Sequence, residues 1–374
     1  MKNNSRIIFL DILRAIAVLM MVQGHTIDSL LADEYRTFDS VIYSVWHTMR
    51  GFTAPIFMFT AGVVFTYLLK LNNLPFKDNP RVVKGLKRFF LLLGLGYLLR
   101  YPTYKIFDFR YVSETQWKIF FAVDALHLIA FGLLFILILT YISEKVKVSS
   151  ITVFSSGAAF FFLMLFVVRE FSWGEILPQF AAGYFTREFG SIFPLFPYAG
   201  YVLAGGVLGI ILAGNKDIYK ESGFMIKLLL IGSSLIAVSY LLFGIINIYE
   251  PQANYWTSRI SIVFFRLGVV LMLNGAIGFA AAKLNNIPNT IKLIGRHTLL
   301  IYVVHLVIIY GSAWSPGVSR YFKHSLTLFE AITAALIMIS LMIGMVLIIN
   351  KLVFERRRKK HKLAAANVYL IKPK

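Results

Sequence analysis

The sequence contains no cysteine among its 374 residues. This absence excludes disulfide bonds, thiolate nucleophiles and thiolate metal sites. Acidic residues are also scarce, because 18 Asp and Glu stand against 38 Lys and Arg, and charged residues make up only 15% of the chain. With 58% hydrophobic residues and a mean hydropathy of +0.72, the composition indicates a membrane protein.

Other signals are missing as well. The sequence has no Walker, dinucleotide-binding or nucleophile-elbow pattern, and it has no HExxH or similar ligand spacing, so no metal site is expected. The net charge of +20 does not indicate a nucleic-acid partner, because the basic residues cluster in alternate short loops and in the tail "ERRRKKHK". The first apolar segment is too long for a cleaved signal peptide and is expected to stay as a helix.

Apolar segments long enough to cross a bilayer recur along the whole chain. They predict an all-α polytopic transmembrane bundle of about ten spans, forming one domain over residues 1–354 and followed by a basic cytoplasmic tail at 355–374. The expected spans are Ile7–Leu31, Thr53–Leu69, Phe89–Tyr101, Ile119–Ile142, Ile151–Val168, Leu195–Ala213, Phe224–Ile248, Ile260–Ala282, Ile291–Ser312 and Leu326–Val353. The basic loops and the basic tail place both termini in the cytoplasm.

The first span carries charges that lipid disfavours. Arg14 and His25 are eleven residues apart, which on a helix is three turns plus about 20° and a rise of about 16 Å, so they share one face. Asp28 follows on the same face. Two simpler interpretations stay open: Arg14 pairs with Asp11 or extends toward the cytoplasm, and His25 bonds a backbone carbonyl in the core.

Further ionisable groups are expected at a similar depth in other spans. They are His47 just before the second span, Asp124 and His127 in the outer half of the fourth, Arg266 in the eighth and His305 in the ninth. Such convergence is typical of a water-lined cavity or an active site. A histidine oriented by a carboxylate is suited to general base catalysis. Alternatively, Asp124 and His127 satisfy each other across one helical turn.

Small residues mark the stretch "YAGYVLAGGVLG", Tyr198 to Gly209, and predict close helix packing there. Internal repeats, similarity between the two halves and broken helices are expected of a transporter. The sequence shows none of these features. The alternative function is transport of a small anion or a glycan precursor. In that case Arg14 and Arg266 would act as counter-ions and His127 as a proton relay.

Four segments resemble a known family. "FLDILRAIAVLMMVQGH" is similar to the first-helix signature of integral-membrane acyltransferases of the acyltransferase-3 type, in which a basic residue precedes a histidine as Arg14 precedes His25. "WHTMRGFTAPIFMFTAG" and "FPLFPYAGYVLAGGVLG" resemble more closely the heparan-α-glucosaminide N-acetyltransferase catalytic domains and their bacterial relatives. "LIGRHTLLIYVVH" is similar to a late helix that is shared more broadly.

The resemblance implies transfer of an acyl group, typically acetyl, from cytoplasmic acetyl-CoA to a sugar hydroxyl or amine beyond a bacterial cytoplasmic membrane. By this analogy His47 matches the catalytic histidine of the glucosaminide branch, and His25 matches the acyltransferase-3 motif. The chain departs from the glucosaminide pattern, which commonly has asparagine at the position of His25. It also lacks the extracytoplasmic domain that some acyltransferase-3 members carry.

These observations predict a membrane acyltransferase that works as follows. Acetyl-CoA binds with its phosphates on the basic residues and its pantetheine along the Arg14 face. His25 or His47 then deprotonates the acceptor or is itself acetylated, and a nearby carboxylate fixes its tautomer. Arg266 or Arg50 stabilises the oxyanion. The catalytic candidates are His25, His47, Asp28, Asp124 and His127, and the binding candidates are Arg14, Arg50, Arg266, His305, Lys84, Lys87, Arg88 and Arg296.

The expected partners are the lipid bilayer, acyl-CoA as the donor substrate and a carbohydrate or glycolipid acceptor. No permanently bound cofactor is expected, and homo-oligomerisation is left open.

Overall fold

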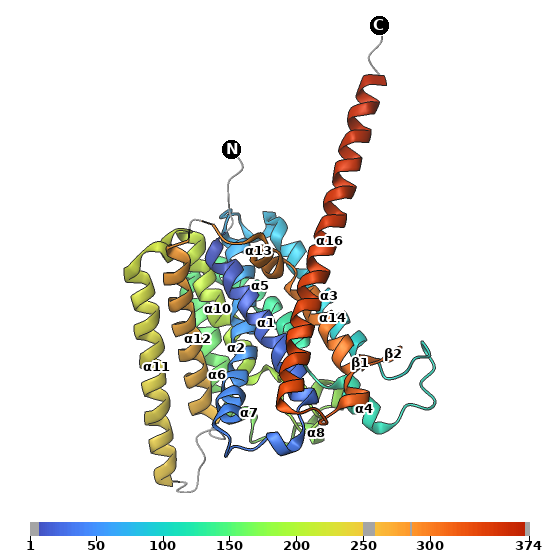
Figure 1. Cartoon of the computed structure of the whole chain (residues 1–374). Helices are drawn as coiled ribbons and strands as arrows, with labels where there is room; N and C mark the ends of the chain where they lie inside the picture. The colour runs from blue at the N-terminus through green and yellow to red at the C-terminus, as the bar shows by residue number, and fades with distance from the viewer. Residues whose placement is uncertain (1–6, 250–258, 285, 371–374) are drawn as a thin grey trace.

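The computed structural model describes residues 7–249, 259–284 and 286–370. Within them the chain is almost entirely helical (Figure 1). The longer helices are α1 (Ile8–Leu30), α2 (Val41–Lys70), α3 (Pro80–Leu99), α5 (Ala125–Val146), α6 (Ser150–Leu163), α10 (Leu195–Gly214), α11 (Ser222–Tyr249), α12 (Arg259–Ala282), α14 (Thr298–Tyr310) and α16 (Leu328–Leu370). Shorter helices are α4 (Glu114–Phe121), α7 (Leu165–Val168), α8 (Trp173–Ile176), α9 (Gln179–Ala182), α13 (Asn289–Arg296) and α15 (Ser319–Phe322).

Short 3₁₀ turns, one small hairpin and an isolated β-bridge between Leu31 and Leu326 complete the described secondary structure. The 3₁₀ turns are η1 (Asp33–Tyr35), η2 (Phe76–Asp78) and η3 (Ile218–Lys220), and the hairpin pairs β1 (Gly311–Ser312) with β2 (Ser315–Pro316) in antiparallel fashion. The predicted all-α bundle is therefore confirmed.

The number of spans differs slightly from the prediction of about ten. Among the described residues, eight helices are long and apolar enough to cross a membrane, or nine if the bent pair α13 and α14 counts as one span. The segment expected at Phe89–Tyr101 lies in α3, which falls outside this set. The first half of α3 carries Arg81, Lys84, Lys87 and Arg88, so the charges of the helix make its apolar part short.

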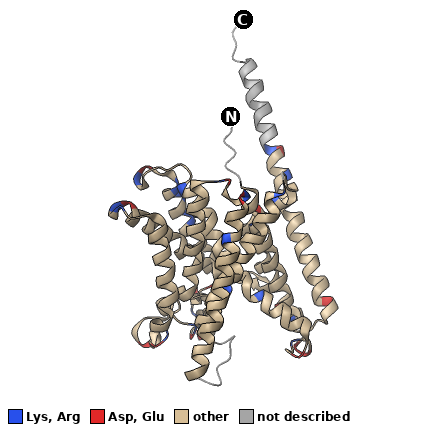
Figure 2. Ribbon diagram, turned by 90° about the vertical axis from the view of Figure 1, so that its left-hand side faces the viewer, with Lys and Arg blue, Asp and Glu red and all other residues tan. Residues whose placement is uncertain are grey.

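The helix α1 lies at the centre of the bundle (Figure 1) and contacts α2, α12, α13, α14 and α16. The pair α11 and α12 forms one edge of the molecule, and α16 forms another and extends beyond the bundle. The helix α16 continues to Leu370, so the segment expected as a separate basic tail prolongs the last span as helix. The start of α1 and the far end of α16 lie on the same face, which we call the terminal face. Figure 2 shows Lys and Arg gathered at loops on this face.

The predicted close packing at the glycine-rich stretch is confirmed. A Cβ atom added to Gly205 of α10 would lie 2.0 Å from the carbonyl oxygen of Phe59 in α2, and one on Gly62 of α2 would lie 1.9 Å from that of Val202 in α10. Only glycine allows the two backbones to approach this closely. The contact fixes α2 and α10 as one unit, and this unit supports the wall of the site described next.

Candidate functional site

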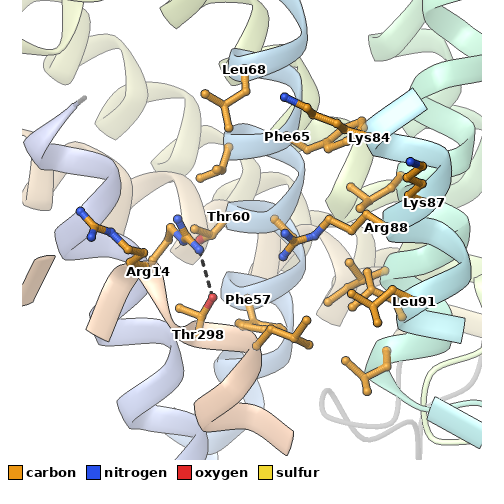
Figure 3. Close-up of a pocket in the computed structure, with 18 of the residues that line it drawn as sticks. Arg14, Phe57, Thr60, Phe65, Leu68, Lys84, Lys87, Arg88, Leu91 and Thr298 are labelled. Atoms are coloured by element: carbon orange, nitrogen blue, oxygen red, sulfur yellow. Dashed lines mark hydrogen bonds between the residues drawn. The ribbon is translucent and has the colours of Figure 1, made fainter. Parts of the chain in front are cut away.

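A cavity of about 530 Å³ opens between α1, α2, α3, α5 and the junction of α13 with α14. Its deeper wall is apolar and includes Phe57 of α2 and Leu91 of α3. Six cationic side chains also line it, namely Arg14, Arg81, Lys84, Lys87, Arg88 and Arg296. Figure 3 shows Arg14 and Arg88 extending toward each other from opposite walls, in front of α2. The cavity therefore combines a cationic lining with an apolar interior.

The break between α13 and α14 shapes one wall of this cavity. The two helices meet at an angle of 74°, and Arg14 Nη2 donates a hydrogen bond to Thr298 Oγ1 at the start of α14, at 3.1 Å. A Cβ atom on Gly295 would lie 2.7 Å from the carbonyl oxygen of Asp11, so glycine lets α13 lie directly on α1. The first amides of α14 thus lie beside a row of cations, which is a favourable arrangement for an anion.

The sequence prediction that no helix is broken is wrong at this place. The apolar pattern of 291–312 suggests one continuous span, and the bend instead falls at His297, whose φ of −103° and ψ of 23° are not helical. The structure does bring five of the predicted binding residues together around the cavity, namely Arg14, Lys84, Lys87, Arg88 and Arg296. They come from three separate elements, so the sequence alone did not place them side by side.

A cluster of rings lies farther along the same two helices, toward the face opposite the terminal face. His25 Nδ1 and the hydroxyl of Tyr310 form a hydrogen bond of 3.2 Å, and the ring of His25 lies 5.5 Å from that of His305, centroid to centroid. His305 is fully buried, and its Nδ1 bonds the carbonyl oxygen of Ile301 at 2.8 Å. We call His25, His305 and Tyr310 the imidazole cluster.

Aromatic stacking links the imidazole cluster to the cavity. The ring of Tyr302 lies 5.6 Å from that of His305, and on its other side it stacks on Phe57 at 5.8 Å with an interplanar angle of 17°. Phe57 itself lines the cavity. A continuous row of rings therefore runs from the cavity wall to His25.

Asp28 does not orient His25, contrary to one of the predictions. Its carboxylate forms an ion pair with Arg50 and accepts a hydrogen bond from Arg36 Nη2 at 3.0 Å. Arg36 Nη1 also donates to the carbonyl oxygen of Asp28 and to His324 Nε2, at 2.8 Å and 2.7 Å. Two arginines thus compete for the same carboxylate, and His25 takes the hydroxyl of Tyr310 as its partner instead.

Asp124 and His127 follow the simpler of their two interpretations. Asp124 caps the N-terminus of α5, where Oδ1 accepts from the Leu126 amide at 2.9 Å and contacts His127 Nδ1 at 3.0 Å. Arg100 Nε lies 3.4 Å from its Oδ2. His127 Nε2 faces α3, since a Cβ atom on Gly96 would lie 2.8 Å from it. The geometry describes a buried helix cap rather than a carboxylate that orients His25 or His47.

His47 and Arg50 lie inside α2 and not before it, because α2 begins at Val41, earlier than the expected Thr53. The half-buried ring of His47 packs against Phe38 and Tyr43, with centroids 5.1 Å and 5.8 Å away. Arg266 of α12 reaches the same region, since its Nη2 would lie 3.5 Å from a Cβ atom on Gly51.

Several residues of the site are not evident from the sequence alone, namely Tyr302, Tyr310, Thr298, Arg36 and Arg100. Tyr302 and Tyr310 flank His305 in "LLIYVVHLVIIY", so a search for polar atoms beside each intramembrane histidine would have found them. Arg36 and Arg100 lie in connections between spans, and only the folded chain shows that they meet Asp28 and Asp124.

Groups of three or more His, Asp or Glu with the geometry of a metal site do not occur in the described part of the chain.

A family model described as "Heparan-alpha-glucosaminide N-acetyltransferase, catalytic" matches residues 6–245, which is more than half of the chain. No curated protein and no solved structure matches. The matched region contains Arg14, His25 and His47, whereas His305 and the bent pair α13 and α14 lie after it.

Proposed function

The chain belongs to the heparan-alpha-glucosaminide N-acetyltransferase catalytic family, and from this premise we propose that it moves an acetyl group from acetyl-CoA to a sugar hydroxyl or amine across the membrane. It is a multi-pass membrane protein of an acetyltransferase family. In the proposal, the donor enters the cationic cavity from the cytoplasm, the acceptor meets the imidazole cluster on the opposite side, and the membrane is the bacterial cytoplasmic membrane.

The observation that carries the proposal is the pairing of α1 with α14. At one level these helices place Arg14 beside Thr298 at the cavity, and farther along they place His25 beside His305 and Tyr310. The guanidinium and ammonium groups of the cavity suit the phosphates of CoA. Its apolar interior suits the pantetheine arm, whose thioester would then point along the row of rings toward His25.

The chemistry proposed for His25 is general base catalysis. As the acceptor oxygen or nitrogen attacks the thioester carbonyl, His25 takes the acceptor proton, with Tyr310 fixing the orientation of its ring. Arg266 is the proposed oxyanion donor, because Arg50 is held by Asp28. His47 is the alternative base and Asp28 a part of the outer wall, and a transient acetyl-histidine is compatible with either imidazole.

One observation favours the alternative function of transport. The broken pair α13 and α14 lies beside the cations of the cavity, and broken helices with their ends at a charged site are typical of transporters. A transporter would bind and move an anion without cleaving a thioester. Release of CoA that depends on an added sugar therefore separates the two functions.

The cationic cavity is tested by Arg14→Ala and Arg88→Ala in the purified protein. Loss of one charge-assisted contact to a phosphate should raise the KM for acetyl-CoA by about tenfold or more, with a smaller effect on kcat. The chain has no cysteine, so free CoA thiol can be followed directly with a thiol reagent. Lys227→Ala, on the exposed surface of α11, is the matched control and should leave the KM unchanged. Equal KM values for all three variants would contradict the donor site.

A further inference from the structure

His305 has one nitrogen whose role the fold defines and one whose role it leaves open. The carbonyl oxygen of Ile301 only accepts, so Nδ1 at 2.8 Å must carry the proton and donate it. Nε2 therefore holds a free lone pair. Nε2 is buried and has no hydrogen-bond partner in the described part of the chain. A buried acceptor without a partner is destabilising, by about 1–3 kcal/mol, and one that lies beside the proposed site is a candidate for a task in the reaction.

The position of His305 indicates what that use is. Its ring lies between His25 at 5.5 Å and Tyr302 at 5.6 Å, and Tyr302 stacks on Phe57 in the cavity wall. His305 is therefore the imidazole on the cavity side of His25. The imidazole of His305 is thus a neighbour of His25 in the direction of the proposed donor site.

The proposed reaction needs such a transfer. When the acceptor hydroxyl or amine attacks the thioester, a bond forms between its oxygen or nitrogen and the acetyl carbon, and the carbon–sulfur bond of acetyl-CoA breaks. The acceptor loses one proton, and the departing thiolate needs one to leave as CoA thiol. The acceptor and the thiolate approach from opposite sides, so one fixed imidazole is poorly placed to serve both.

We propose that His305 relays the acceptor proton from His25 to the CoA thiolate. His25 takes the proton, His305 Nε2 accepts it while Nδ1 stays bonded to Ile301, and the imidazolium of His305 then protonates the sulfur. The thiolate is the stronger base, since thiols titrate near 8.5 and imidazole near 6.5, so the last step is downhill. This relay rests on the proposed acetyl transfer and adds to it a second imidazole with a separate task.

Two substitutions separate this role from a purely structural one. His305→Asn places an amide nitrogen where Nδ1 lies, so it retains a donor for Ile301 and removes the basic nitrogen. His305→Gln places its amide near Nε2 instead and gives up the bond to Ile301. Neither amide is a base. The relay therefore predicts that both variants lose about 10²–10³-fold in kcat, while the KM for acetyl-CoA stays close to the native value.

The assay follows CoA thiol release from acetyl-CoA with α-methyl glucosaminide as the acceptor. Turnover is divided by the number of acetyl-CoA binding sites in each preparation, so that misfolded protein does not count. A His305→Asn protein that keeps kcat within about threefold of native, while His305→Gln loses it, would assign His305 a structural role and overturn the relay alone. A native protein that releases no CoA with any hexosamine or hexose acceptor would overturn the proposed function together with the relay.

Discussion

The histidines of this bundle differ in what their nitrogen atoms contact, and the separate roles that we propose for them rest on this difference. His127 is enclosed by its own helix cap and by α3. His324 bridges Asp33 and Arg36 in the connections opposite the terminal face. His25, which bonds Tyr310 and borders His305, is the imidazole that has both a fixed orientation and a chemical neighbour. Contacts at this scale, and not depth in the membrane alone, are the reason that we propose His25 as the base.

His25→Ala is expected to reduce kcat for sugar-dependent CoA release by about 10²-fold or more, because it removes the proposed general base. His47→Ala is the matched comparison, since the ring of His47 packs against those of Phe38 and Tyr43, and it should lose no more than a few-fold. Both are compared with native protein at saturating acetyl-CoA. The reverse order of the two losses would transfer the role of base to His47.

At the scale of helices, the sequence predicted most of the architecture. Long apolar runs give spans whose bounds match α1, α10 and α12 within a few residues, because lipid imposes length and composition. The start of α2 and the break at His297 were missed. The first turns of α2 carry polar residues next to exposed apolar ones, and the bend at His297 lies beside the contact of Gly295 with α1. Such tertiary contacts leave no periodic signal in the sequence.

The candidate site also has a part that the sequence predicted and a part that it did not. The sequence supplied Arg14, His25 and His305 because an ionisable residue inside an apolar span is conspicuous. It did not show which carboxylate meets which base, since Asp28 and Asp124 are engaged by Arg50 and Arg100 from other elements. The pairing of partners across helices is a property of the packed bundle, and it reassigned both carboxylates.

The close contact between α2 and α10 predicts how an added methyl group at this contact changes the stability of the protein. Gly205→Ala would place a Cβ atom against the Phe59 carbonyl and should lower the unfolding temperature, because overpacking costs about 1–3 kcal/mol. Gly94→Ala in α3 is the control, as nothing lies within 4 Å of its Cβ position. It should be neutral or stabilising. Tryptophan fluorescence on heating in detergent measures both, and equal unfolding temperatures would mean that the two helices do not touch there.

At the scale of the whole molecule, the charge distribution is the basis for the proposed direction of the reaction. Basic loops gather on the terminal face (Figure 2), and the cationic cavity is lined by the N-terminal half of α3, which follows one of these loops. The imidazole cluster lies at the other ends of α1 and α14. If the terminal face is cytoplasmic, as its lysines and arginines predict, donor and acceptor use opposite faces of one protein.

Acetyl transfer in oriented proteoliposomes tests this account most directly. The variant Lys216→Cys carries a single cysteine in the connection between α10 and α11. Labelling of this cysteine by an impermeant maleimide reports which face of the protein is outward, because the native chain has no cysteine. With the terminal face outward, external acetyl-CoA should acetylate α-methyl glucosaminide enclosed in the vesicle. Transfer only to acceptor on the same side as acetyl-CoA would contradict a reaction that crosses the membrane.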